Sequence, residues 1–531
     1  MQTVSAAFDT RTSAAIRKVT TKVFISFQKD FDDTIDFFTI GVSAIAGTDI
    51  LKGDGSVVQE WEKYSYTDYS DRVISVETNR ETEPPTSPVT LATCDIILDN
   101  HDDLFTPGND ASPLAGFLLS RRPVRVNVGF GNETIPKFVG LTLGRPKIDE
   151  RSKTATIHCV DFLNAIMGIG LDEEVMYQNA STSAIIQGLL ETAGLVASQF
   201  NLDAGSVVIP FAYFKKGMTL GNALREVAEA EIGNVYMTEA GVIRFENRVN
   251  WNSKVPSYIY DKDNMLDRQS LDVDTVINDV RVYSNARAVQ AKQPVWQGNA
   301  PVRFTDGAVS LQSGETKSIF ADFRDDFGEL PVTTVDDPDP VSLATTSVYA
   351  ANSASDGSGD DLSGDVDLGS TDVFSTAMKL TFTNNGSQEA FLTQLELWGT
   401  PARVVAEIYE RITDAASIGS FDGFEEHVHE IRNDLIQDST AARTIGQMII
   451  EDRAEDDDQQ KWIVKAVPHQ QVGDVVTYNE QNADEDYFVT RVNDIINSSG
   501  YRQVLRVSKR TINTYFRIGI STIGGPDPLG P

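Results

Sequence analysis

The stretch from Ser181 to Arg248 constrains the fold of this chain most, because several independent local signals agree within it. Residues 181–194 combine an N-cap serine, apolar residues at helical spacing and a terminal glycine, which together predict a helix. A second helix is predicted from Thr219 to the break at Gly233, because its apolar residues recur every three or four positions. Its glutamates are expected to face solvent: Glu226, Glu229 and Glu231.

A strand pair is predicted directly after this second helix. Residues 235–237 and 242–248 are apolar or alternate apolar with charged side chains, and Gly241 lies in the turn between them. The whole stretch is therefore expected to be a compact α+β unit made of packing residues. It contains no nucleophile, base or ligand cluster.

Short alternating runs separated by Gly, Pro and Asn fill most of residues 76–165. In residues 92–98, every second side chain is apolar, and Cys94 lies on this apolar face. Such runs are typical of a small antiparallel barrel. Similar runs recur in residues 256–293 and 401–510, where they predict a second barrel that carries a helix at 438–452.

Residues 294–400 interrupt this second strand-rich block. They are rich in Ser, Thr, Asp and Gly and have almost no helical periodicity, which predicts an inserted β-sandwich. The expected fold class is mainly β with α+β: two antiparallel β-barrel domains joined by a small α+β domain, with the sandwich inserted. The expected domains are an N-terminal β-rich extension (1–75), the first barrel (76–165), the α+β linking domain (166–255), the second barrel (256–293 with 401–510), the sandwich (294–400) and a Gly/Pro-rich C-terminal tail (511–531).

Charge and composition exclude several classes of protein. The 531-residue chain has 45 Lys and Arg against 78 Asp and Glu, a net charge of −33, which opposes duplex binding through phosphate neutralisation. The same excess suits either a high-salt habitat or a surface past which a polyanion slides with little adhesion. No apolar run approaches the length of a bilayer span and the N-terminus lacks a signal-type apolar segment, so we expect no stable membrane insertion. Cys94 and Cys159 are expected to be buried free thiols.

Candidate metal ligands are few. His427 and His429 would share one face of a strand and could bind a transition metal together with Glu425, but no third His or Cys is near. The Asx-rich turn at 99–103 lacks the spacing of a calcium loop and is expected to be a plain turn. The same holds for a second acidic segment, which predicts a solvated loop: Asp356, Asp360, Asp361 and Asp365.

No catalytic or cofactor-binding residue is predicted. The chain has neither the G-x-S-x-G pattern of a nucleophile elbow nor the G-x-x-x-x-G-K-[ST] pattern of a phosphate-binding loop. Three nearby tyrosines are read as sheet-edge or core residues, with a sugar-binding or partner surface as the alternative: Tyr64, Tyr66 and Tyr69.

The order of several segments along residues 20–510 resembles the tail hub proteins (baseplate, tail-tip hub or minor tail proteins) of tailed bacteriophages and related injection machines. The segments include ATCDIILDNHDDLFTP, FVGLTLGRP, AIIQGLLETAGL, ALREVAEAEIGNVYMTEAGVIRFENR and PHQQVGDVVTY. The family's usual turn after the first barrel strand is Asn-x-Asp-Gly-x-Phe. Here the turn runs from Asn100 to Phe105, and Asp103 takes the place of the glycine.

This resemblance implies a structural virion protein without catalysis. The family forms homotrimers of two-barrel subunits that join the tail tube to the tail tip or baseplate and form part of the DNA ejection channel. Implied partners are the tail tube or a distal tail protein, tip, fibre or receptor-binding proteins, the tape measure protein and the genomic DNA in passage. The implied location is the virion tail tip or baseplate, after assembly in the host cytoplasm.

Two other functional classes stay open. A tail-associated cell-wall or polysaccharide hydrolase would need two carboxylates that lie close together in space, and the spacing of Asp and Glu along the sequence does not indicate which two these would be. A glycan-binding adhesin would use the sandwich, through Tyr349, the neighbourhood of Trp398 or the Asp-rich loop.

Overall fold

The computed structural model describes residues 1–12, 14, 17–28, 64–82, 88–248, 250, 254–271, 276–299, 308–335, 349–420, 426–454, 459–480 and 483–509. The rest of the predicted N-terminal extension, including residues 29–63, and the predicted tail at 511–531 lie outside these residues. In the described part, no helix has both the length and the apolar character needed to cross a membrane.

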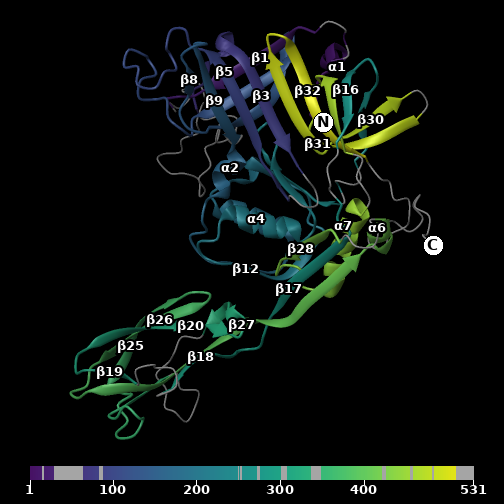
Figure 1. The fold of residues 1–531 in the computed structure, drawn as a ribbon. Helices are drawn as coiled ribbons and strands as arrows, with labels where there is room; N and C mark the ends of the chain where they lie inside the picture. Colours follow the sequence, from purple (N-terminus) through teal and green to yellow (C-terminus); the bar gives the residue numbers. More distant parts are fainter. Residues whose placement is uncertain are drawn as a thin grey trace.

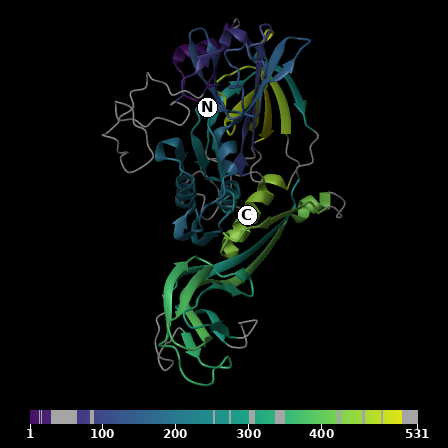
Figure 2. The same ribbon diagram turned by 90° about the vertical axis from the view of Figure 1, so that its left-hand side faces the viewer.

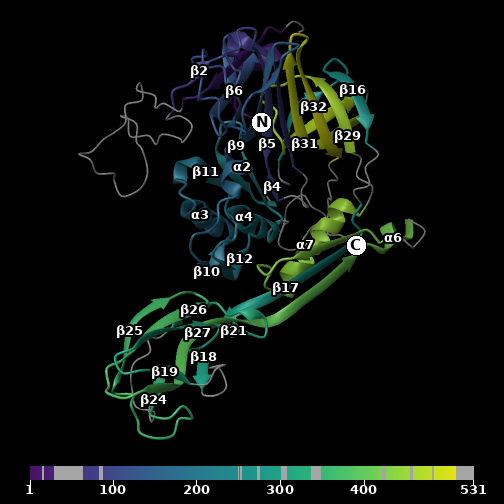
Figure 3. The same ribbon diagram turned by 60° about the vertical axis from the view of Figure 1, so that its left-hand side comes forward.

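The described chain is arranged in three tiers (Figure 1). Two strand-rich blocks lie side by side in the upper tier, an α+β unit that contains α2 (Phe162–Met167) and α4 (Leu220–Glu229) lies in the middle, and the inserted segment extends away below. The turned views in Figure 2 and Figure 3 show the same order of tiers. The two strand-rich blocks therefore lie at the end of the molecule opposite the insert.

One 14-stranded sheet contains both strand-rich blocks. The first block is the path β3-β5-β9-β7-β6-β1, to which the short strands β2 and β8 add. The second block is the path β31-β32-β29-β16, with β30 and β15 branching from β31. The first-block strands are β1 (Val19–Ile25), β2 (Thr67–Asp68), β3 (Val73–Glu81), β5 (Ala92–Asp99), β6 (Pro123–Phe130), β7 (Glu133–Thr142), β8 (Lys147–Asp149) and β9 (Thr154–Asp161). Those of the second block are β15 (Pro256–Tyr260), β16 (Met265–Ser270), β29 (Gln459–Lys465), β30 (Val475–Glu480), β31 (Ala483–Asn497) and β32 (Gly500–Lys509).

The two blocks meet at a seam between β3 and β31, which pair antiparallel from Ser75 opposite Asn497 to Glu81 opposite Arg491. Each block has its own apolar core. Ile496 of β31 packs into the core of the first block, whereas Trp462 is at the centre of the second. Separate barrels were expected. The structure joins both blocks edge to edge, because residues 75–81 of the 9-residue strand β3 pair with residues 491–497 of the 15-residue strand β31.

Closure of each block into a barrel is not seen in the strand pairing of the described residues. In the second block, β15 and β16 are the two ends of the path and are joined by a turn at 261–264, yet no ladder links them. Side chains from β15, β29, β30, β31 and β32 nevertheless share one core. The mainly β fold class is confirmed, and the closed barrels stay a prediction.

The α+β unit follows the prediction closely. Its helices are α2 (Phe162–Met167), α3 (Thr182–Thr192) and α4 (Leu220–Glu229), and its strands are β10 (Val175–Ser181), β11 (Phe200–Leu202), β12 (Val208–Phe214), β13 (Asn234–Met237) and β14 (Ile243–Glu246); β4 (Val89–Thr90) pairs with β13. The expected caps are present, because Ser181 Oγ accepts from the N–H of Ala184 and Thr219 Oγ1 accepts from the N–H of Asn222. The predicted hairpin is the antiparallel pair β13 and β14.

The glutamates of this unit do not face solvent as expected. Glu231 is 5% exposed and accepts hydrogen bonds from Thr182 Oγ1 and from the backbone N–H of Ser206. Glu226 and Glu229 are half-buried, and burial raises the pKa of both. The prediction was wrong because Glu231 lies beyond the end of α4, where the chain turns inward and helical periodicity no longer decides which way a side chain points.

A further correction concerns the second predicted barrel. Strand β17 (Asp279–Val289), which we expected there, pairs with β27 (Ala390–Thr413) and β28 (Val428–Arg432) in a different sheet, which α7 (Ser439–Arg453) covers. Apolar residues of these elements share the core of the α+β unit. Residue patterns correctly predicted the strands and the helix, with Asp438 as the N-cap of α7, but could not tell which layer would cover their apolar faces.

The inserted segment has a core of its own between two sheets, as expected for a sandwich. The 24-residue strand β27 runs from this segment into the α+β unit, so it belongs to both. The strands of the insert are β18 (Gln293–Asn299), β19 (Val309–Leu311), β20 (Thr316–Asp322), β21 (Arg324–Asp325), β22 (Gly328–Glu329), β23 (Val332–Val335), β24 (Tyr349–Asn352), β25 (Val366–Val373) and β26 (Ala377–Asn384). The remaining described elements are α1 (Ala6–Thr12), α6 (Ala415–Ser420) and the 3-10 turns η1 (Ser70–Arg72) and η2 (Ala197–Gln199).

Candidate functional site

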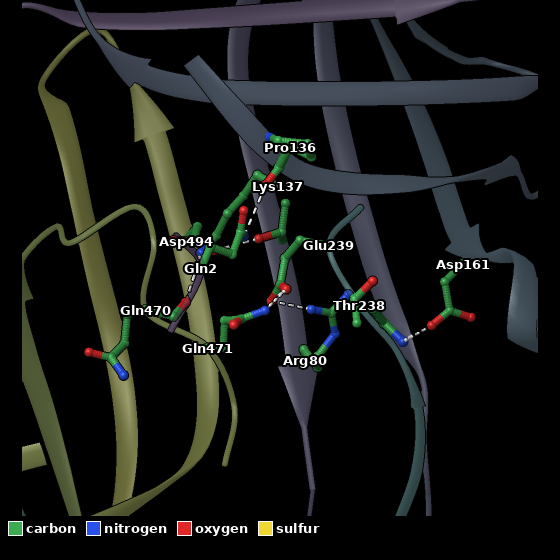
Figure 4. Close-up of polar contacts among 12 residues, drawn as sticks. Gln2, Arg80, Pro136, Lys137, Asp161, Thr238, Glu239, Gln470, Gln471 and Asp494 are labelled. Carbon is green, nitrogen blue, oxygen red and sulfur yellow. Dashed lines mark hydrogen bonds and ion pairs between the residues drawn. The ribbon is translucent and has the colours of Figure 1, made fainter. Parts of the chain in front are cut away.

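A buried polar network lies where the two blocks meet the α+β unit (Figure 4). The seam places Thr78 opposite Asp494 and Val76 opposite Ile496, and both pairs point to the side of the sheet that holds the apolar cores. Strand alternation puts every second seam residue on this inner side. The polar network is therefore enclosed between the two cores.

Asp494 is the centre of the network and is 1% exposed. Its carboxylate accepts hydrogen bonds from Thr78 Oγ1 at 2.8 Å, Tyr501 Oη at 2.7 Å and Gln503 Nε2 at 2.8 Å. Lys137 Nζ lies 3.2 Å from its Oδ2. A buried carboxylate is tolerated when its oxygens are saturated by donors in this way.

Lys137 comes from β7 of the first block and is 3% exposed. Besides its ion pair with Asp494, its ammonium donates to the carbonyl oxygens of Pro468 at 2.9 Å and Gln470 at 3.3 Å, which lie in the loop between β29 and β30. The adjacent Pro136 carbonyl accepts from Gln2 Nε2 at 3.1 Å. One strand of the first block is thus bound to the second block and to the N-terminal segment.

Arg80 and Glu239 tie the α+β unit to the seam. Glu239 lies in the turn between β13 and β14, is 4% exposed, and pairs with Arg80 of β3. Its other carboxylate oxygen accepts from Gln471 Nε2 of the second block. A single carboxylate therefore contacts both blocks from the tip of the central hairpin.

Asp161 completes the junction at the end of β9. It caps α2 by accepting from the N–H of Asn164 at 2.9 Å, and it accepts from the N–H of Ala92 at 2.7 Å. Burial raises its pKa to about 6 despite these hydrogen bonds. This residue holds the first helix of the α+β unit against the sheet.

The network has little free space and its charged groups contact one another. The charged groups are paired, burial raises the pKa of Tyr501 well above its usual range, and the cavity beside Lys137 and Glu239 measures about 10 Å³, room for one water at most. These groups offer neither an accessible nucleophile nor space for a substrate. The network joins three parts of the chain into one body.

The two candidate metal ligands, His427 and His429, lie just before and at the start of β28. His429 lies on β28, and burial lowers its pKa; His427 precedes that strand and donates its backbone N–H to Asn278 Oδ1 at 2.7 Å. Glu425 lies outside the described residues. Within the part of the chain that the structure covers, no three His, Cys, Asp or Glu side chains are placed to hold a metal ion.

The Asx-rich turn adopts the conformation that glycine usually supplies. Asp103 has a φ of +55°, in the left-handed region, at the position where the resembling family has glycine. Asn100 is fully buried and its side chain bridges the turn, accepting from the N–H of Phe105 at 2.8 Å and donating to Thr106 Oγ1 at 2.9 Å. The acidic segment of the insert also forms local Asx turns, such as Asp356 with Ser358.

The remaining sequence candidates are mostly packing residues. Tyr69 and Tyr349 are buried, and Tyr349 donates its hydroxyl to the Val366 carbonyl at 2.6 Å, which excludes it as a glycan contact. Trp398 is half-buried in β27, as are Tyr64 and Tyr66 near β2. The cysteines are buried free thiols, as expected, and lie opposite each other on β5 and β9: Cys94 and Cys159.

Sequence reasoning missed the network itself. One signal was present, because Lys137 interrupts the apolar run of β7, and a lone charge in such a run indicates a buried partner. Its partner, Asp494, is more than 350 residues away along the chain. No local pattern connects the two.

No protein-family model matches the sequence, and no curated protein matches it. Solved structures that align with the chain include three tail proteins. The 43 kDa tail protein of prophage MuSo2 from Shewanella oneidensis is 10% identical, with 84% of this chain and 95% of that chain covered and a TM-score of 0.41. The tail protein from Neisseria meningitidis MC58 is 8% identical, with 84% and 93% covered and a TM-score of 0.43. Prophage tail protein gp18 from Listeria monocytogenes EGD-e is 8% identical, with 87% and 95% covered and a TM-score of 0.38. All three are tail proteins, the class that the sequence resembles. Because their TM-scores lie below 0.5, these similarities carry no argument about the function of this chain.

Proposed function

We propose that this protein is a structural subunit of a phage-type tail: a hub of which three copies join the tail tube to the tail tip or baseplate around the channel for outgoing DNA. The observation that carries this proposal is the pair of strand-rich blocks, with eight and six strands, joined edge to edge within one chain. Three such chains would present six similar blocks, which suits a junction between a six-fold tube and a three-fold tip.

The buried network supports a mechanical role. Lys137 with Asp494, and Arg80 with Glu239, are buried ion pairs that fix both blocks and the α+β unit relative to one another. Pairing one block to the next also covers a sheet edge that would otherwise aggregate. A subunit that transmits force between neighbouring proteins needs such rigid junctions between its domains.

The insert is proposed to contact the tip. It extends away from the blocks on the two strands β17 and β27 (Figure 1). In this role the subunit acts at the virion tail tip or baseplate after assembly in the host cytoplasm. Its partners are then a tail tube or distal tail protein, the tape measure protein, a tip, fibre or receptor-binding protein, and DNA in passage.

The mass of the purified protein in solution, measured by light scattering, together with negative-stain images, tests the proposal. We expect three times the mass of the 58.2 kDa chain and a ring with a central hole. A single-chain mass at all concentrations would contradict the proposal. Activity on purified envelope material that one carboxylate substitution abolishes would point to the hydrolase alternative instead.

A further inference from the structure

The outer face of the shared sheet, the face turned away from the two apolar cores, carries opposite charges on its two halves. Strand register aligns its side chains in rows. In the second block, Lys461 lies opposite Arg506 and Arg506 opposite Arg491, while Lys465 lies opposite Arg502. We call these five residues of β29, β32 and β31 the basic half.

The acidic half lies across the seam on the first block. Glu77 and Glu81 alternate with inward residues on β3, and Glu77 lies opposite Asp95 of β5. Asp99 is on the same face of β5, two alternations further along. The four carboxylates of Glu77, Glu81, Asp95 and Asp99 therefore continue the same surface that bears the basic half.

Contacts within the chain use only part of this charge. At the seam, Glu81 pairs with Arg506 at 2.7 Å and with Arg491 at 3.7 Å. Among the residues that the structure describes, no carboxylate pairs with the three remaining cations of the basic half: Lys461, Lys465 and Arg502.

Distance explains why the two lysines stay unpaired. Neighbouring strands are about 4.8 Å apart, so Lys461 and Lys465 on β29 lie three strands, or about 14 Å, from β3, whereas Arg502 lies two strands from Glu77, the separation that Arg506 spans to reach Glu81. The acidic half is thus out of reach of both lysines in their own chain. It is within reach when two chains meet.

We propose that this face is a contact between copies of the chain, in which the basic half of one copy meets the acidic half of the next. Charge complementarity favours a second copy of the chain as the partner. The chain has a net charge of −33 and leaves cations of its basic half unpaired, so the acidic half of another copy is the best complement for these cations. Nucleic acid is disfavoured because the same face carries four carboxylates that repel phosphates. The inference rests on the proposed assembly of several copies.

Charge reversal tests the contact. The basic-half variant is Lys461→Glu with Arg502→Glu, and the acidic-half variant is Glu77→Lys with Asp95→Lys. Each variant brings like charges together between copies, so we expect the mass in solution to fall from the multimer to the single chain. The chain that carries all four substitutions restores opposite charges and is expected to recover the multimer.

A matched control separates this effect from net charge. Lys216→Glu with Arg225→Glu makes the same charge change as the basic-half variant on exposed positions of the α+β unit, and it should keep the wild-type mass. Raising the salt from about 0.05 M to about 0.5 M should also weaken the wild-type multimer, because exposed ion pairs are screened. Circular dichroism checks that every variant is folded.

The outcomes distinguish this inference from the proposed function. If the wild type is a multimer and both reversal variants keep its mass, the proposed contact is wrong while the hub proposal stands. If both reversal variants dissociate and the variant with all four substitutions does not recover the multimer, the proposed contact is also wrong, because charge complementarity would then not be what holds the copies together. A wild type that is a single chain overturns the trimer itself.

Discussion

Replacing Lys137 with methionine should destabilise the junction of the two blocks by about 3–5 kcal/mol, the usual cost of removing one partner of a buried ion pair. Lys137 is 3% exposed and Asp494 1%, with 3.2 Å between the charged groups. Methionine keeps most of the side-chain volume, so the loss comes from electrostatics and not from a cavity. The carboxylate keeps its three neutral donors, whereas the carbonyls of Pro468 and Gln470 lose theirs.

Calorimetry provides the assay. At about 2–4 °C per kcal/mol for a domain of this size, the melting temperature should fall by about 6–20 °C. Amide hydrogen exchange should accelerate first at the β3 and β31 seam. The control Lys147→Met, on an exposed lysine of β8, should stay within about 0.5 kcal/mol. A melting temperature within about 2 °C of the wild type would refute the reasoning that this pair holds the blocks together.

Three further predictions follow from other parts of the structure. Burial, and to a lesser degree repulsion by Asp434, raises the pKa of Glu226 from 4.5 to about 7, so the folded state binds a proton on this carboxylate more tightly than the unfolded state does. Protonated Glu226 therefore stabilises the fold fully below pH 4.5, and this contribution is lost as the pH rises through about 7. Glu226→Gln should therefore be more stable than the wild type at pH 8, by about 1–3 kcal/mol in urea unfolding, and lack this pH dependence; equal stability of the two proteins at pH 8 would contradict it. Asp103→Gly should stabilise the first block by about 0.5–1 kcal/mol in thermal unfolding, because glycine adopts a φ of +55° without strain, and a loss of stability would show that the aspartate side chain matters more. Glu174 of the α+β unit accepts from the N–H and hydroxyl of Ser375 in the insert, so Glu174→Ala should speed hydrogen exchange at residues 374–376 without changing exchange in the blocks; unchanged exchange would mean that β17 and β27 alone hold the insert.

Local structure was predictable wherever neighbouring residues decide it. The helices begun by Ser181 and Thr219, the hairpin around Gly241 and the apolar face of β5 each depend on contacts between residues a few positions apart. The turn at Asp103 shows the limit of this reasoning. The missing glycine could be read from the sequence, but Asn100 and its buried hydrogen bonds decide the conformation.

The partners of these elements could not be predicted. The sequence determined that the chain has two strand-rich blocks, a helical unit and an inserted β-rich segment, because periodicity and turn residues act over short distances. Only the tertiary structure decided that β3 pairs with β31, that β17 and α7 join the core of the helical unit, and that Lys137 meets Asp494. An apolar face or a free strand edge can be covered by many equivalent surfaces. Which surface covers it in the native fold depends on packing and charge compensation summed over the whole folded chain, and no local sequence pattern contains that sum.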